Sequence, residues 1–118
     1  MDHNTLGKYG EDIVVSWLEG HQYQVIIRNY RCRQGEIDII AKDRGILVFI
    51  EVRTLTGYDT QRALASINRK KQKRLLATAR HYLAYHVDEL EPEIRFDCVG
   101  VNFDQSGNIE CELLKGAF

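Results

Sequence analysis

The sequence predicts one α/β domain over residues 1–118, with an αβββαβ core, a mixed central sheet flanked by helices, and an extra edge strand at the C-terminus. Helical apolar spacing occurs near the N-terminus and again after residue 66, and short apolar or alternating segments lie between and after these two stretches. The long crossover before the fourth strand indicates parallel pairing there, because an antiparallel partner needs only a short hairpin.

The first helix is expected to run to about Glu19, with Asn4 or Thr5 as its N-cap and Gly20 at its end. An apolar stripe with helical spacing should face inward. Its members are Leu6, Tyr9, Ile13, Trp17 and Leu18.

Five strands follow from short apolar runs bounded by turn residues. They are expected at residues 23–30, 36–42, 46–54, 95–103 and 109–114. A polar loop, LTGYDTQRA, separates the third strand from a second helix, which Ser66 should cap and which should extend to about Val87. Its inward positions should be Ile67, Leu75, Leu76, Ala79, Tyr82 and Leu83. Pro92, within DELEPE, marks a linker.

Composition excludes several classes of protein. The chain is 44% hydrophobic and 28% charged, as is ordinary for a globular domain. No apolar run approaches the roughly 18 residues of a membrane span, and the polar, acidic start does not resemble a signal peptide, so we expect a cytoplasmic protein. Cys32, Cys98 and Cys111 are far apart and form no CxxC, which predicts reduced thiols rather than disulfides or a zinc site.

Charge is nearly balanced overall but uneven locally. A net charge of −1 argues against a generic polyanion binder, yet RNYRCR and RKKQKR are basic clusters. A local basic surface is typical of nucleic-acid binding, and the second cluster contributes Lys70, Lys71 and Arg74 as candidate contacts. The common alternative for such a run is a solvated helix face.

Two acids lie on strands with apolar neighbours. Side chains alternate along a strand, so Glu51 shares a face with Leu47 and Phe49. The opposite face of the same segment is also apolar, which is typical of a central strand covered on both sides. Glu51 should therefore be at or near a buried position.

Turn geometry then relates Glu51 to Asp38. If the hairpin loop is Arg44–Gly45, counting outward places Asp38 directly opposite Glu51. Opposed like charges destabilise a sheet by up to about 1 kcal/mol, and a divalent cation such as Mg²⁺ or Mn²⁺ would neutralise them. Two alternatives stay open: a three-residue loop would put the acids on opposite faces, and an ion network through Arg53 would need no metal.

Several blocks of the sequence resemble a known family. GKYGE, RNYRCRQGEIDIIA, LVFIEVR, KKQKRLLATARHYL and RFDCVGV are similar to the YraN-like family of uncharacterised bacterial proteins. That family is similar in turn to the restriction-endonuclease-like superfamily, with its PD-(D/E)xK signature and its archaeal Holliday-junction resolvases. The resemblance implies a restriction-endonuclease-like fold and metal-dependent cleavage of nucleic acid.

The resemblance also implies roles for particular residues. Asp38 and Glu51 would bind the metal, and Glu11 would approach the same site from a helix that Gly7 and Gly10 allow to lie close. Lys71 matches the family's helix lysine and could contact a phosphate. Two further residues, Arg95 and Asp97, match the RFD block, for which the simpler interpretation is an ion pair at a strand end that packs on the core.

This chain departs from the family at Arg53, where the pattern has lysine, and at Leu55, where an arginine is frequent. A lysine in such a site can position or deprotonate water. Arginine stays protonated and cannot act as a base, although its guanidinium can hold a phosphate. The departure puts catalysis, but not metal binding, in question.

The leading hypothesis is a divalent-metal-dependent endonuclease-like protein with catalytic residues Asp38, Glu51 and Arg53, acting on DNA in preference to RNA, with Mg²⁺ or Mn²⁺ as cofactor. One alternative is a non-catalytic nucleic-acid-binding module on a degenerate nuclease fold. Another is a structural or interaction protein with a buried ion network. A homodimer stays open, and no membrane partner is expected.

Overall fold

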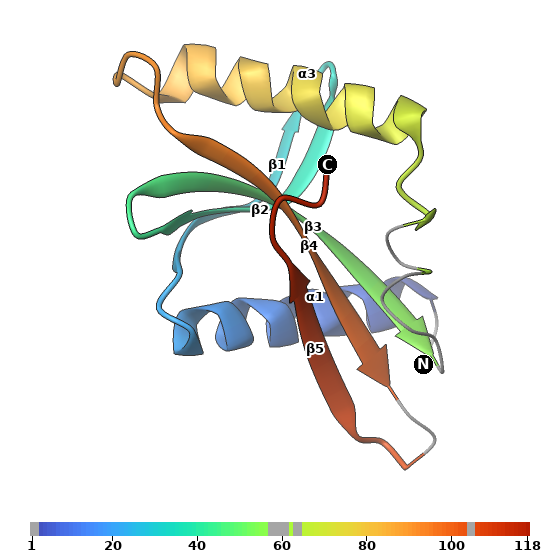
Figure 1. The fold of residues 1–118 in the computed structure, drawn as a ribbon. Coiled ribbons are helices and arrows are strands. Elements are labelled where there is room, and N and C mark those ends of the chain that lie inside the picture. The colour runs from blue at the N-terminus through green and yellow to red at the C-terminus, as the bar shows by residue number, and fades with distance from the viewer. Residues whose placement is uncertain (1–2, 57–61, 63–64, 104–105) are drawn as a thin grey trace.

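The computed structural model describes residues 3–56, 62, 65–103 and 106–118, apart from the side chains of residues 3–7 and 55–56. Within these residues, five strands form one mixed sheet in the order β1-β2-β3-β4-β5, in which β3 and β4 pair in parallel and the other neighbours pair antiparallel (Figure 1). The elements are α1 (His3–Gly20), β1 (Gln24–Cys32), β2 (Gly35–Asp43), β3 (Ile46–Thr56), α3 (Arg69–His86), β4 (Ile94–Phe103) and β5 (Ile109–Leu114). The predicted α/β class, the crossover and the C-terminal edge strand are confirmed.

Helices α1 and α3 cover opposite faces of the sheet (Figure 1). On one face, Leu75, Ala79 and Tyr82 of α3 pack on a core that includes Phe49. On the other face, Val14 and Leu18 of α1 pack on a core that includes Ile50. The central strand β3 is therefore buried on both sides, as its two apolar faces predict. None of the helices in the described part of the chain is long and apolar enough to cross a membrane.

The predicted inward stripe of α1 is right at Leu18 and wrong at Tyr9, while Ile13 and Trp17 are half-buried and the side chain of Leu6 lies outside the described residues. Val14 and Leu18 are fully buried, whereas Tyr9 is 45% exposed. The helix also begins at His3, so Asn4 and Thr5 lie within its first turn and neither is the cap. Gly10, Val14 and Leu18 recur at intervals of four residues and form the face that meets the sheet. Both stripes are apolar, and packing against the sheet selects between them.

The predicted start of α3 also needs correction. Asn68, not Ser66, is the N-cap, and its Oδ1 accepts the Lys71 backbone N–H at 2.9 Å. That bond satisfies one of the free donors in the first turn of the helix. Leu76, predicted to face inward, is 38% exposed, while Leu75 is buried.

The β2–β3 hairpin has the predicted two-residue loop. Asp43 pairs with Ile46, and Arg44 and Gly45 both have positive φ values, 52° and 87°. This geometry matches the right-handed twist of the two strands. The ladder continues only to the pair Ile39–Ile50, one residue short of the predicted pair of acids. The register of the hairpin is confirmed, but the strands part where Asp38 would meet Glu51.

Gly10 allows α1 to lie close to β3. A Cβ atom at this position would lie 2.5 Å from Oγ1 of Thr54, well inside van der Waals contact. Any larger residue would therefore have to push the helix away from the strand end. The close approach keeps Glu11, the next residue, beside the point where β2 and β3 part.

Candidate metal and phosphate site

Asp38 lies where the β2–β3 ladder ends. Its Oδ2 accepts the backbone N–H of Val52 at 2.8 Å. The carboxylate thus takes the donor that the neighbouring strand no longer pairs, which holds the side chain against β3. Burial raises the pKa of Asp38, and the Val52 hydrogen bond opposes that shift by favouring the ionised form.

Glu51 is the buried member of the pair. Only 5% of its surface is exposed. Two cations face its Oε1: Nζ of Lys71 at 3.3 Å and Nη2 of Arg53 at 3.8 Å. Lys71 lies in the first turn of α3, so this contact connects α3 to the Glu51 carboxylate on β3. The ammonium group of Lys71 therefore lies beside Glu51, where a cation compensates the buried negative charge.

Burial and the charge of Asp38 raise the pKa of Glu51 to about 7, against the opposing effects of Lys71 and Arg53. The dependence on Asp38 means that the two acids are close enough to repel each other. Pairing in register also places Cys98 beside Glu51. Burial and the Glu51 charge raise the pKa of this thiol to about 11, so it stays neutral near pH 7.

Glu11 approaches the pair from α1. Burial, and then the charge of Asp38, raise its pKa. Its Oε1 lies 3.7 Å from Nη2 of Arg28 but has no hydrogen-bond partner. Asn29 donates a hydrogen bond to the same carboxylate and has a positive φ of 55°, a conformation that asparagine tolerates better than most residues.

Glu11 is nevertheless not assembled with the other two acids. Across the described ranges, no three His, Cys, Asp or Glu side chains are grouped closely enough to hold a metal ion. Asp38 and Glu51 alone still fit Mg²⁺, which is commonly bound by one or two carboxylates together with water and substrate phosphates. Metal binding at this pair, with Glu11 as a third ligand, stays a prediction.

Of the three basic residues predicted to contact nucleic acid, two line the same cavity and one does not. Arg74 and Lys71 line a cavity of about 360 Å³ between α3 and the β1–β2 turn. Its other lining residues are Arg31, Cys32, Gly35, Glu36 and Leu75. Lys70 is exposed and lies outside this lining. The cavity is next to the acid pair because Lys71 belongs to both.

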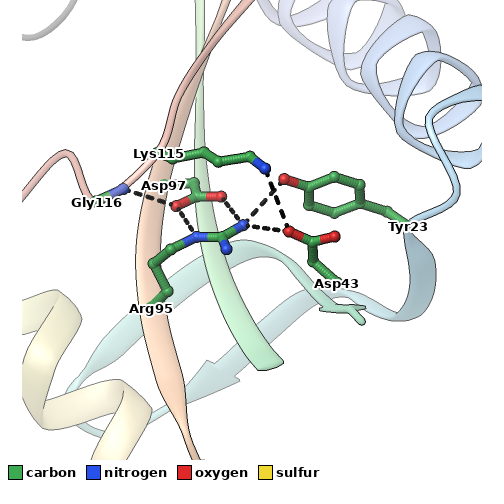
Figure 2. Close-up of polar contacts among 6 residues, drawn as sticks. All are labelled: Tyr23, Asp43, Arg95, Asp97, Lys115 and Gly116. Atoms are coloured by element: carbon green, nitrogen blue, oxygen red, sulfur yellow. Dashed lines mark hydrogen bonds and ion pairs between the residues drawn. The ribbon is translucent and has the colours of Figure 1, made fainter. Parts of the chain in front are cut away.

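Arg95 and Asp97 form a second polar cluster, away from the acid pair. The guanidinium bonds both carboxylate oxygens of Asp97 at 2.8 Å, and it also bonds Asp43 and the Tyr23 hydroxyl at 3.0 Å (Figure 2). Asp97 is fully buried and accepts a further bond from the Gly116 backbone N–H at 3.0 Å. The RFD block therefore holds the start of β4, the hairpin and the C-terminal segment together.

Sequence reasoning missed three features of the acid pair. It did not relate Lys71 to Glu51, it gave no role to Asn29, and it did not place Cys98 beside Glu51. The one local signal is Asn29 in the RNY block, because asparagine is enriched at backbone positions with positive φ. The other two contacts join separate elements and have no local signal.

A test of the buried acid uses its pKa. The Glu51 pKa rises from an ordinary 4.5 to about 7 on folding, so the native state binds the extra proton between these values. Stability should therefore fall as pH rises from about 4.5 to 7, by roughly 3 kcal/mol for this group alone. We expect the free energy of unfolding of Glu51→Gln to rise by about this amount relative to wild type as the pH rises from 4 to 8. The measurement is urea unfolding of both proteins in EDTA.

The matched control is Glu110→Gln, at an exposed position on β5. Its stability relative to wild type should not change with pH over the same range. Parallel pH profiles for wild type and Glu51→Gln would contradict the raised pKa.

The chain is similar to proteins of one bacterial family. A model of the uncharacterised protein family UPF0102 matches residues 10–101. Three relatives, each named UPF0102 protein, are 37%, 40% and 42% identical to this chain. The Caldicellulosiruptor bescii protein matches over 100% of both chains, that of Chlorobium limicola over 92% of this chain and 84% of its own, and that of Treponema denticola over 81% and 79%.

A solved structure, that of Pyrococcus furiosus SfsA in complex with Ca²⁺, aligns with 95% of this chain at a TM-score of 0.38 and 16% identity. This chain spans 63% of the length of that protein. A likeness at this level supports no inference about function.

Proposed function

This chain belongs to the uncharacterised protein family UPF0102, and we propose that it is a divalent-metal-dependent nuclease-like protein that hydrolyses phosphodiester bonds, in DNA in preference to RNA. The observation that carries the proposal is the pair of acids at the end of the β2–β3 ladder, Glu51 buried and Asp38 half-buried. Burial and mutual repulsion disfavour their ionised forms, and two acids with raised pKa values side by side are typical of functional sites.

The residues around the pair suit a phosphodiester. Asp38 and Glu51 supply hard oxygen ligands for Mg²⁺ or Mn²⁺. Lys71 and Arg53 place positive charge within 4 Å of Glu51, where the phosphate of a bound strand would lie. When bound, the metal ion would lower the pKa of a water and stabilise charge developing on the phosphate.

Proton transfer is the weak point of the site. Arg53 keeps its proton, so it can orient the phosphate but cannot accept a proton from water. Lys71 is held by Glu51 and is 37% exposed, which suits charge compensation. Low turnover is therefore expected. A binding module without turnover is the second candidate function, and the arginine at this position is the observation that favours it.

The proposal is tested by cleavage of five labelled substrates: a single strand, a duplex, a flap, a four-way junction and an RNA, each in Mn²⁺, Mg²⁺ and EDTA. We expect slow, metal-dependent cutting of at least one DNA substrate by wild type and none by Asp38→Ala. Glu110→Ala is the matched control, because it also removes a carboxylate, but from an exposed position on β5. Its cutting should stay within about twofold of wild type.

Cutting that persists in Asp38→Ala would indicate a contaminating nuclease and would overturn the assignment of the site. Calorimetry with Mn²⁺ separates the remaining outcomes. Metal binding that Asp38→Ala abolishes, without cutting of any substrate, would favour the binding module. Equal heats in both proteins would remove the metal site.

A further inference from the structure

One face of α3 carries a row of basic and aromatic side chains. Lys71, Arg74, His81 and Tyr85 lie along the same side of the helix. Thr78, between Arg74 and His81 on this side, is fully buried against Gly35 of the β1–β2 turn, so the row has two parts. At 1.5 Å per residue, the row extends about 21 Å from the lysine beside Glu51 to Tyr85. It therefore leads away from the acid pair along the length of the helix.

The first two members of the row, Lys71 and Arg74, form one wall of the cavity described above. Gly35, at a φ of 153°, lies so close to α3 that a Cβ there would be 3.0 Å from Oγ1 of Thr78. This approach brings Arg31 of the β1–β2 turn to the same cavity as Arg74. Three cations and one carboxylate, Glu36, line it, and such a surface attracts a phosphate.

At the far end of the row, the exposed ring of Tyr85 lies against the ring of His81, and we call this pair the aromatic ledge. Tyr85 is 74% exposed, and its ring lies 4.6 Å from that of His81, tilted by 33°. Nδ1 of His81 is hydrogen-bonded to the Tyr30 hydroxyl at 2.5 Å. Tyr30 is 6% exposed and makes an edge contact with Tyr82 at 5.2 Å. The ledge is thus attached to the core, with the outer side of Tyr85 open.

We propose that this face of α3 binds an unpaired strand of nucleic acid, with phosphates at the cavity beside Arg74 and one base stacked on Tyr85. Aromatic rings accept any unstacked base, because every base has a π face. A base inside a duplex has both faces covered by its neighbours and cannot use the ledge. This inference rests on the proposed function and specifies its substrate: a strand that is single, or splayed from a duplex, next to the cut.

The dimensions and charges of the row fit that ligand. Successive phosphates of one strand rise about 3.4 Å in a stacked duplex, so about 21 Å corresponds to roughly six nucleotides, and fewer if the strand is extended. The segment after α3 is acidic. It contains Asp88, Glu89, Glu91 and Glu93. Its charge would repel phosphates beyond Tyr85 and would limit the strand to the helix.

The test measures binding in EDTA, so that it does not depend on metal or cleavage. Anisotropy of a labelled 12-nucleotide single strand should show about tenfold weaker binding to Tyr85→Ala, within the range of stacking losses for one base. Tyr85→Phe should bind within about twofold of wild type. Leu90→Ala is the matched control, since Leu90 is 91% exposed but lies outside the row.

Abasic sites identify the stacked base. When a single abasic site is moved along the strand, one position should weaken wild-type binding about tenfold and should have no further effect in Tyr85→Ala. Arg74→Ala should reduce the salt slope by about one, equally for intact and abasic strands. Binding of a blunt duplex should not respond to Tyr85→Ala.

Two results would overturn the role of Tyr85 while leaving the proposed function intact. In the first, Tyr85→Ala binds the single strand as tightly as wild type, while Asp38→Ala abolishes cleavage. In the second, Tyr85→Ala weakens binding, but no position of the abasic site removes the difference from wild type. The latter would mean that Tyr85 acts through the fold or through a protein contact. If wild type binds the strand through Tyr85 but Asp38→Ala changes neither metal binding nor cleavage, the ledge stands and the proposed nuclease site falls.

Discussion

Arg53→Lys should raise metal-dependent cleavage by about a hundredfold, the lower end of what a positioned general acid or base contributes. A lysine can lose its proton in a buried site and accept one from water, whereas arginine cannot. The site should accept the change, because Nε of Arg53 is buried without a hydrogen-bond partner and lysine has no polar atom there. The measurement is initial-rate cleavage, in Mn²⁺, of whichever substrate wild type cuts.

Two further variants make this result interpretable. Arg53→Lys combined with Asp38→Ala should cut nothing, which excludes a contaminating nuclease. Arg53→Ala should weaken substrate binding, because it removes a charge 3.8 Å from Glu51. If wild type cuts robustly and Arg53→Lys cuts less, arginine is the adapted residue, and our account of it as a handicap is wrong. No gain with Arg53→Lys would favour the binding module.

Arg95→Met should destabilise the protein by about 3–5 kcal/mol, which is typical when one partner of a buried ion pair is removed. The change leaves Asp97, which is fully buried, and Asp43 without their main cation. The measurement is urea unfolding near pH 7. Amide exchange should also accelerate at Gly116 and Ala117, whose N–H groups bond Asp97 and the Phe96 carbonyl at 3.0 and 2.8 Å.

Arg31→Met is the matched control for this loss. Arg31 pairs with Glu36 at 3.3 Å, but its side chain is 74% exposed, so the change should cost no more than about 1 kcal/mol. An Arg95→Met protein as stable as Arg31→Met would show that the cluster in Figure 2 does not hold the fold together.

The stability from this cluster should also depend on pH in a defined direction. Burial opposes ionisation of Asp43, but hydrogen bonds from Arg95 and Lys115 outweigh it and hold the Asp43 pKa below its usual 3.8. That contribution is therefore present above about pH 4 and is lost as the pH falls further. The difference between wild type and Arg95→Met should shrink in acid.

The order and kind of the elements could be predicted because they depend on local patterns. Apolar alternation predicted the strands, and two residues with positive φ, Arg44 and Gly45, suited a two-residue hairpin. That hairpin in turn predicted a register that the structure has from Asp43–Ile46 to Ile39–Ile50. Each of these inferences needs only neighbours in the chain.

Helix phase could not be predicted in the same way. The stripe through Tyr9 and Ile13 and the one through Gly10 and Val14 are both compatible with an amphipathic helix. The choice depends on how closely the helix approaches the sheet, and only the glycine leaves room for Thr54. The same limit applies to Leu76, which the pattern placed inside and which is 38% exposed.

By itself the sequence determined the αβββαββ order, and for a two-residue loop it predicted the hairpin register, because both follow from side-chain alternation and a short turn. The structure decided between the two loop lengths and ended the ladder one pair before Asp38 and Glu51. Only the tertiary structure decided that Lys71 faces Glu51, that Arg95 joins Asp43 and Tyr23, and that Tyr85 stands exposed on His81. These contacts join residues from different elements. Their geometry is set by how helices pack on a twisted sheet, which no local pattern encodes.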